Sequence, residues 1–131
     1  MQLTEHFALE EFSRSDTARQ HGIDNTIPAS YIPNLQRLCR EVLEPLRAYA
    51  GEPVTISSGY RCPELNRRVG GVRNSQHLTG NAADIYHPTP STLLSWYTWL
   101  RATFPHHQVL YEHRGRTVWI HVGYMQPAGT K

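Results

Sequence analysis

The stretch Ser75-Gln76-His77-Leu78-Thr79-Gly80-Asn81-Ala82-Ala83-Asp84 places a histidine and an aspartate seven residues apart, with small residues between them. Residues 82–86 are predicted to form a strand, on which Ala82 and Asp84 point to the same face. Gly80 would let the chain turn, so that His77 returns over that face. A neutral imidazole and a carboxylate could then share a cation, and Ala82 is small enough to leave room for it. The spacing alone also fits a capping histidine and a surface aspartate.

A third metal ligand has to come from elsewhere, because a catalytic zinc ion usually has three protein ligands and one open position. The chain has eight histidines, and His121 is the best placed of them. It interrupts residues 118–122, which are otherwise apolar and predict a strand. Taken alone, His121 also fits a core histidine whose hydrogen bonds are satisfied.

Glu112 is a candidate general base on the preceding predicted strand. A two-residue turn at Gly115-Arg116 would pair Glu112 with Trp119. Cross-strand partners share a face, so Glu112 and His121 would point the same way, about 7 to 8 Å apart along the diagonal. That distance suits a carboxylate beside a metal-bound water. A three-residue turn would instead send Glu112 to the other face.

The remaining pattern predicts an α+β fold, in which a small antiparallel sheet packs against helices. Residues 30–50 carry apolar side chains at helical spacing, with Pro45 expected to kink or divide the helix and Gly51 to end it. Residues 17–28 read as irregular. The other expected elements are a helical turn at 9–12, a strand at 54–57, helices at 63–69 and 89–104, and strands at 108–112 and 118–122.

Composition indicates one domain spanning residues 1–131. Hydrophobic residues make up 39% of the chain, no apolar run is long enough for a membrane span, and the start lacks the pattern of a secretory signal. The net charge is +2 and the basic residues are scattered, so nucleic-acid binding is not expected. Cys39 reads as a small buried hydrophobe and Cys62 as a loop residue. Neither belongs to a CxxC pair, and a disulfide between them stays open.

Taken together, these residues resemble a known family. The pattern His77-x-x-Gly80-x-Ala82-x-Asp84, with Ser57-Ser58-Gly59-Tyr60-Arg61 before it and Trp119-Ile120-His121-Val122 after it, resembles the zinc D-Ala-D-Ala carboxypeptidases. Small single-domain members common in phages, including endolysins, are the most similar. The resemblance spans most of the chain, including the opening at residues 9–12. It implies the fold that these peptidases share with the amino-terminal half of the hedgehog signalling protein.

The resemblance also implies roles for individual residues. His77, Asp84 and His121 would bind Zn²⁺. Arg61 would bind substrate or stabilise an oxyanion, and Ser75 would hydrogen-bond substrate or a ligand. Several relatives carry an acidic residue three positions before the last histidine. Val118 stands there in this chain, so Glu112 is the substitute base.

The expected substrate is the peptide part of bacterial peptidoglycan, cut by a carboxypeptidase or endopeptidase. Tyr60 and Trp119 are expected to line the substrate groove, and they fit equally well as ordinary core or rim aromatics. We expect a monomer that is made in the cytoplasm and acts at the cell wall, such as a phage lysin or a tail-associated enzyme.

Two other functions fit the same residues. One is a non-catalytic zinc module that binds cell wall or serves as a phage structural part, with His87 or His113 closing the fourth position on the metal. The other is a zinc amidase that cleaves the junction between sugar and peptide. Arg61 also has a structural interpretation, as an ion-pair partner of Glu64 or a donor to a loop carbonyl.

Overall fold

A four-stranded sheet forms the centre of the protein, for which the computed structural model describes residues 1–126. Its strands lie in the order β1-β2-β4-β3, and each neighbouring pair is antiparallel. The bounds are β1 (Thr55–Ser58), β2 (Ala82–Tyr86), β3 (Gln108–Arg114) and β4 (Thr117–Gly123). The predicted α+β class with an antiparallel sheet is therefore confirmed.

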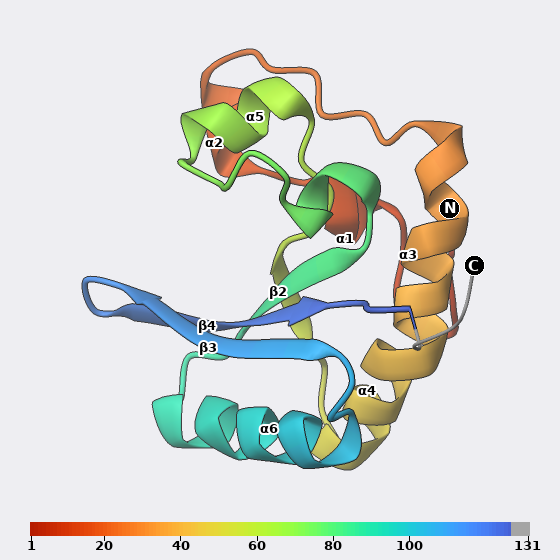
Figure 1. The fold of residues 1–131 in the computed structure, drawn as a ribbon, viewed down its shortest axis with the longest axis vertical. Coiled ribbons are helices and arrows are strands. Elements are labelled where there is room, and N and C mark those ends of the chain that lie inside the picture. The colour runs from red at the N-terminus through yellow and green to blue at the C-terminus, as the bar shows by residue number, and fades with distance from the viewer. Residues whose placement is uncertain (127–131) are drawn as a thin grey trace.

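Helices surround this sheet. Figure 1 shows α6 packed against the β3–β4 hairpin, while α2 and α5 lie together at the opposite end of the molecule. Within residues 1–126, no helix combines the length and the apolar character needed to cross a membrane. The α-helices are α1 (Glu10–Ser13), α2 (Asp16–Gln20), α3 (Ile32–Leu38), α4 (Glu44–Ala50), α5 (Pro63–Arg68) and α6 (Pro90–Thr103), and short 3₁₀ helices are η1 (Ala29–Tyr31) and η3 (Gln76–Thr79).

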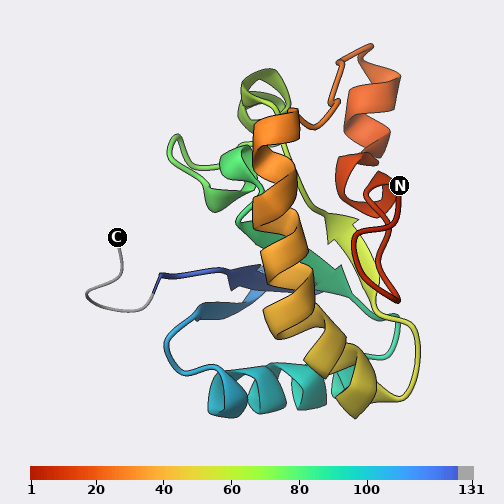
Figure 2. The same cartoon turned by 90° about the vertical axis from the view of Figure 1, so that its right-hand side faces the viewer.

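The long helix predicted over residues 30–50 is continuous but changes its winding. A π-helical segment, η2 (Cys39–Leu43), joins α3 to α4 just before Pro45. Proline has no N–H to donate and crowds the preceding turn, and the wider π turn accommodates both effects. The kink expected at Pro45 therefore takes the form of a π segment. The continuous rod formed by α3, η2 and α4 crosses the sheet in Figure 2. Gly51 ends the helix in a left-handed conformation (φ 67°), as predicted.

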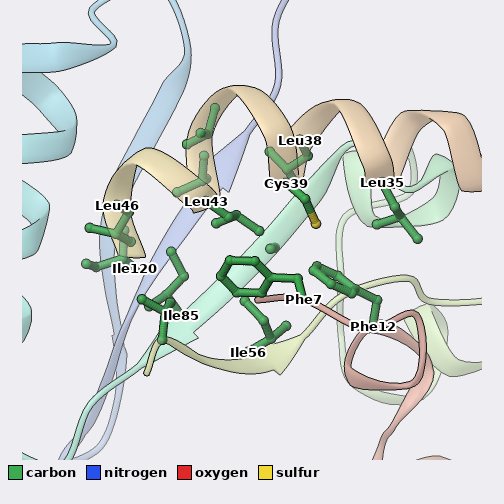
Figure 3. Packing of buried hydrophobic residues seen from close by; sticks show 14 of the residues in the cluster. Phe7, Phe12, Leu35, Leu38, Cys39, Leu43, Leu46, Ile56, Ile85 and Ile120 are labelled. Atoms are coloured by element: carbon green, nitrogen blue, oxygen red, sulfur yellow. The ribbon is translucent and has the colours of Figure 1, made fainter. Parts of the chain in front are cut away.

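The core lies between this rod, the inner face of the sheet and the amino-terminal segment (Figure 3). Phe7 and Phe12 reach it from the amino terminus, and both are at most 1% exposed. The sheet contributes Ile85 and Ile120, which are direct partners across β2 and β4. Because side chains alternate along a strand, the neighbours of these two residues point to the opposite face, where a site can form. Cys39 is fully buried, and both cysteines are free.

One segment differs from the prediction. Residues 17–28 read as irregular, but α2 (Asp16–Gln20) occupies their beginning. Ser15 caps this helix, because its hydroxyl accepts a hydrogen bond from the Ala18 N–H at 3.1 Å. Ala18 then packs with Ile23 and Leu65 in a small second cluster. This cluster anchors α5, which follows the loop that carries Arg61.

Candidate metal centre

Three side chains from three elements converge on the outer face of the sheet. His77 lies on η3, Asp84 on β2 and His121 on β4. Asp84 and His121 are direct cross-strand partners, and Gly80 turns the chain between η3 and β2 with φ 75°. Asp84 Oδ1 lies 3.2 Å from His77 Nε2 and 3.0 Å from His121 Nδ1. The structure therefore brings together the three residues expected as ligands.

This group has the chemistry of a zinc site. One nitrogen or oxygen from each residue lies within 4.8 Å of the other two, and His77 and Asp84 are buried. Burial would raise the pKa of Asp84, but hydrogen bonds with His121 and His77 outweigh it and hold that pKa below its ordinary value. The carboxylate therefore stays ionised between two imidazoles. Two imidazole nitrogens and one carboxylate are a donor set that suits zinc and leaves a coordination position open.

The nitrogen of each imidazole that faces away from Asp84 also has a partner. His77 Nδ1 lies 2.6 Å from the Gly59 carbonyl oxygen, and His121 Nε2 lies 3.1 Å from Gln108 Oε1. Gly59 must be glycine for packing, because a Cβ there would approach Phe12 Cα to 2.6 Å. Sequence reasoning did not find either partner. Gly59 and Phe12 stand inside segments that carried the resemblance, whereas Gln108 gives no signal in the sequence.

A cavity of about 340 Å³ opens beside the three residues. It holds both acidic and basic side chains, so it suits a polar substrate. The lining residues are Arg61, Val69, Gly70, Gly71, Val72, Ser75, His77, Asp84, Gln108, Leu110, Glu112, Arg114, Trp119 and His121.

Arg61 contacts Asp84, one of the three candidate ligands. Its Nη2 lies 3.3 Å from Asp84 Oδ2, its Nη1 donates to Asn66 Oδ1 at 3.1 Å, and its Nε donates to Ser58 Oγ at 3.1 Å. Burial lowers the pKa of the guanidinium, and the nearby charges of Asp84 and Glu112 oppose that effect. The ion-pair partner is thus Asp84, and the alternative with Glu64 is wrong.

Glu112 lines the same cavity as the ligands. The β3–β4 hairpin has the predicted two-residue turn, with Arg114 opposite Thr117 and Glu112 opposite Trp119. This register places Glu112 on the face of the sheet that carries His121. The Trp119 indole N–H donates to Glu112 Oε1 at 2.9 Å, so the carboxylate is held in place. Trp119, expected to contact substrate, also orients the candidate base.

The other two predicted site residues have different positions. Ser75 lines the cavity, and its hydroxyl accepts a hydrogen bond from the His77 N–H at 3.1 Å. Tyr60 is only 5% exposed and packs in the core, with its ring 6.0 Å from that of Tyr31. It does not line the cavity, so the structure does not bring Tyr60 together with the other candidate site residues. Its side chain belongs to the main hydrophobic core.

Neither histidine considered as a fourth ligand lines the cavity. His87 Nε2 contacts Glu52 at 2.9 Å, and His113 is exposed on the other side of the β3 strand from Glu112. A second group of potential ligands comprises Glu5, His6 and Glu44. The Glu44 carboxylate there already accepts hydrogen bonds from Thr4 and from the His6 N–H, which explains the cluster as an anchor for the amino-terminal segment.

Comparison with known proteins adds two findings. A family model described as peptidase M15 matches residues 5–123. A curated relative, the zinc D-Ala-D-Ala carboxypeptidase of Streptomyces albus G, is 42% identical over 38 residues. That stretch is 29% of this chain and 15% of the relative, so it covers only a small part of the relative's length.

Proposed function

Because this chain belongs to the peptidase M15 family, we propose that it is a zinc-dependent peptidase that hydrolyses amide bonds in the peptide part of bacterial peptidoglycan. One observation carries the proposal: His77, Asp84 and His121 converge at a cavity that also contains Arg61 and Glu112. The name of the Streptomyces albus G relative supports both the metal and the class of substrate.

The three proposed ligands would hold zinc through His77 Nε2, Asp84 Oδ1 and His121 Nδ1, the atoms that face one another. A zinc ion in such a site supplies Lewis acidity and activates water for attack on a carbonyl group. The protein's part is to present these donors on a rigid frame. Two of them are fixed by the register of β2 against β4, and the third by the turn at Gly80.

Glu112 is the proposed general base. Its carboxylate accepts a proton from the attacking water and then donates that proton to the leaving amine. The indole N–H of Trp119 donates to Oε1, so Oε2 is the oxygen that would take the proton. Proton transfer by a positioned side chain typically contributes a factor of about 10² to 10⁴ in rate.

Arg61 is the proposed electrophilic residue. Its guanidinium stands at the cavity wall between Asp84 and Asn66, where it can donate to the substrate carbonyl oxygen as negative charge develops. Removing one such donor typically costs about 10² to 10³ in turnover. Ser75 helps to position His77, because its hydroxyl accepts a hydrogen bond from the His77 backbone N–H.

The finer parts of the proposal concern the reaction and its setting. The proposal includes both D-Ala-D-Ala carboxypeptidase activity and endopeptidase activity, on stem peptides or on cross-links. We propose that residues 1–131 form one catalytic domain, acting as a monomer at the cell wall in the manner of a phage lysin or tail enzyme. The position of Glu112 in the cavity favours this enzyme over a non-catalytic zinc module.

Mass spectrometry of peptidoglycan fragments tests the proposal directly. Purified cell wall is incubated with the protein, with the protein plus a chelator, and with chelated protein to which zinc is restored. We expect new peptide fragments in the first and third samples, and their masses identify the bond that is cut. A variant with Glu112→Gln should bind zinc and release almost no fragments. If the zinc-loaded protein leaves the cell wall intact, the enzymatic proposal is wrong.

A further inference from the structure

The two imidazoles of the metal centre are oriented by different kinds of acceptor. A histidine that binds a metal through one ring nitrogen carries its proton on the other, and the partner of that N–H selects the tautomer. For His77 the partner is the backbone carbonyl of Gly59, which can only accept a hydrogen bond. Nδ1 of His77 must therefore carry the proton, and Nε2 is left for the ion.

His121 has the opposite arrangement, because its Nδ1 faces Asp84 and its Nε2 faces outward. The partner of Nε2 is a side chain, Gln108, whose Oε1 lies 3.1 Å away. Gln108 is the first residue of β3 and pairs with Gly123. Leu110, two residues further along β3, is the direct partner of His121. Gln108 therefore shares a face with His121 and reaches it along the diagonal, a span that a long side chain can cover.

We propose that Gln108 is a positioning residue for the metal centre, whose side-chain carbonyl selects the His121 tautomer with Nδ1 free for the ion. The inference rests on the proposed zinc site. Acceptors in this position are often carboxylates, which make the imidazole a stronger ligand. A neutral amide orients the ring without adding negative charge, so the centre keeps Asp84 as its one anionic ligand.

Three substitutions at residue 108 separate this role from a general structural one. Gln108→Leu removes the acceptor, Gln108→Asn keeps the amide but shortens its reach, and Gln108→Glu restores an acceptor that carries a charge. Loss of such an outer partner typically weakens metal binding 10- to 100-fold. We therefore expect zinc dissociation constants about 10- to 100-fold higher for the Leu and Asn variants, and a value at or below that of the wild type for Gln108→Glu.

Zinc affinity is measured by competition with a chromophoric chelator, at one fixed pH. Gln20→Leu, the same substitution at an exposed position on α2, is the matched control and should bind zinc like the wild type. Gln108 is itself exposed, so the melting temperatures of the zinc-free variants should match that of the wild type. Nitrogen-15 NMR of the zinc-loaded protein should show the proton of His121 on Nε2.

Wild-type zinc affinity in both the Leu and Asn variants overturns the proposal, as does an NMR spectrum with the proton of His121 on Nδ1. Neither result would contradict the proposed peptidase activity, because the protein would still bind zinc and still release peptide fragments. A wild-type protein that binds no zinc would instead overturn both. The two proposals can therefore fail separately.

Discussion

Replacing Gly71 with alanine should disable catalysis without removing a metal ligand. An added Cβ would lie 2.1 Å from Asn66 Oδ1 and 2.8 Å from Arg61 Nη1, whereas ordinary contacts begin at 3.4 Å. The loop cannot retreat easily, since the Gly71 N–H donates to the Asn66 carbonyl at 2.9 Å and Asn66 Nδ2 donates to the Val72 carbonyl at 2.8 Å. Asn66 Oδ1 must move by about 1.3 Å instead and Arg61 Nη1 by about 0.6 Å, and because Nη1 donates to that same Oδ1, the displaced amide also disturbs the hydrogen bond that holds Arg61.

A misplacement of about 1 Å at a catalytic group can cost about 10² in rate. We therefore expect kcat/KM on a peptidoglycan stem peptide to fall about 100-fold in the Gly71→Ala variant, while zinc is still bound at one ion per chain. Overpacking should also lower the free energy of unfolding by about 1 to 3 kcal/mol.

Gly51→Ala is the matched control for this prediction. It is also a glycine-to-alanine change, and the positive φ of Gly51 makes alanine unfavourable there, by about 1 to 2 kcal/mol. Because Gly51 does not line the cavity and a Cβ added there would meet no atom within 4 Å, the control should lose stability and keep its turnover. Full kcat/KM in folded Gly71→Ala protein would refute the link from Gly71 through Asn66 to Arg61.

Three further predictions concern single side chains. Glu112→Gln should lower kcat at least about 100-fold with zinc retained, in the same peptide assay; near-normal turnover would remove Glu112 as the base. Trp119→Phe removes the hydrogen bond from the indole to the Glu112 carboxylate, and hydrogen bonds to charged groups typically contribute about 1.5 to 3 kcal/mol. This variant should lower kcat about tenfold or more. Unchanged turnover would show that the indole does not orient Glu112. Burial raises the pKa of the Cys39 thiol to about 12, from an ordinary value of 9.0. As pH rises, the unfolded chain therefore loses this proton before the folded protein does. The free energy of unfolding should then fall between pH 9 and pH 12. Denaturant titrations should show that Cys39→Ala lacks this loss, of up to about 1.4 kcal/mol per pH unit, and parallel curves for the two proteins would contradict the assignment.

One part of the site could be predicted because it depends on strand register, whereas the set of three ligands came from the resemblance. A two-residue turn fixed the pairing of Glu112 with Trp119, and alternation along β4 then placed His121 on the same face. Asp84 followed from its position two residues after Ala82 on a strand whose bounds, Ala82–Tyr86, agree with the structure. Turn length and alternation along a strand are local features, so they can be predicted without knowledge of the tertiary fold.

Interactions between distant segments could not be predicted in the same way. The sequence does not show that Gln108 would face His121, or that Gly59 would present its carbonyl to His77 across 18 residues. The burial of Tyr60 could not be predicted for the same reason. An aromatic residue beside Arg61 fits a groove or a core equally well, and only the tertiary packing, which places Tyr60 in the main hydrophobic cluster near Tyr31, decides for the core.

Arg61 illustrates why a structural and a catalytic role need not exclude each other. A guanidinium has five N–H donors, and three hydrogen bonds to Ser58, Asn66 and Asp84 use one each on Nε, Nη1 and Nη2. Two donors are left, one on each terminal nitrogen, and the residue lines the cavity. The protein contacts prevent the side chain from swinging, so its free donors are already oriented before a substrate oxygen arrives. Asp84 likewise serves two groups at once, because Oδ1 faces the two histidines while Oδ2 faces Arg61. As a ligand, this one buried carboxylate would fix a bound metal relative to the group proposed to stabilise the oxyanion, and such preorganisation is what makes a donor effective in catalysis.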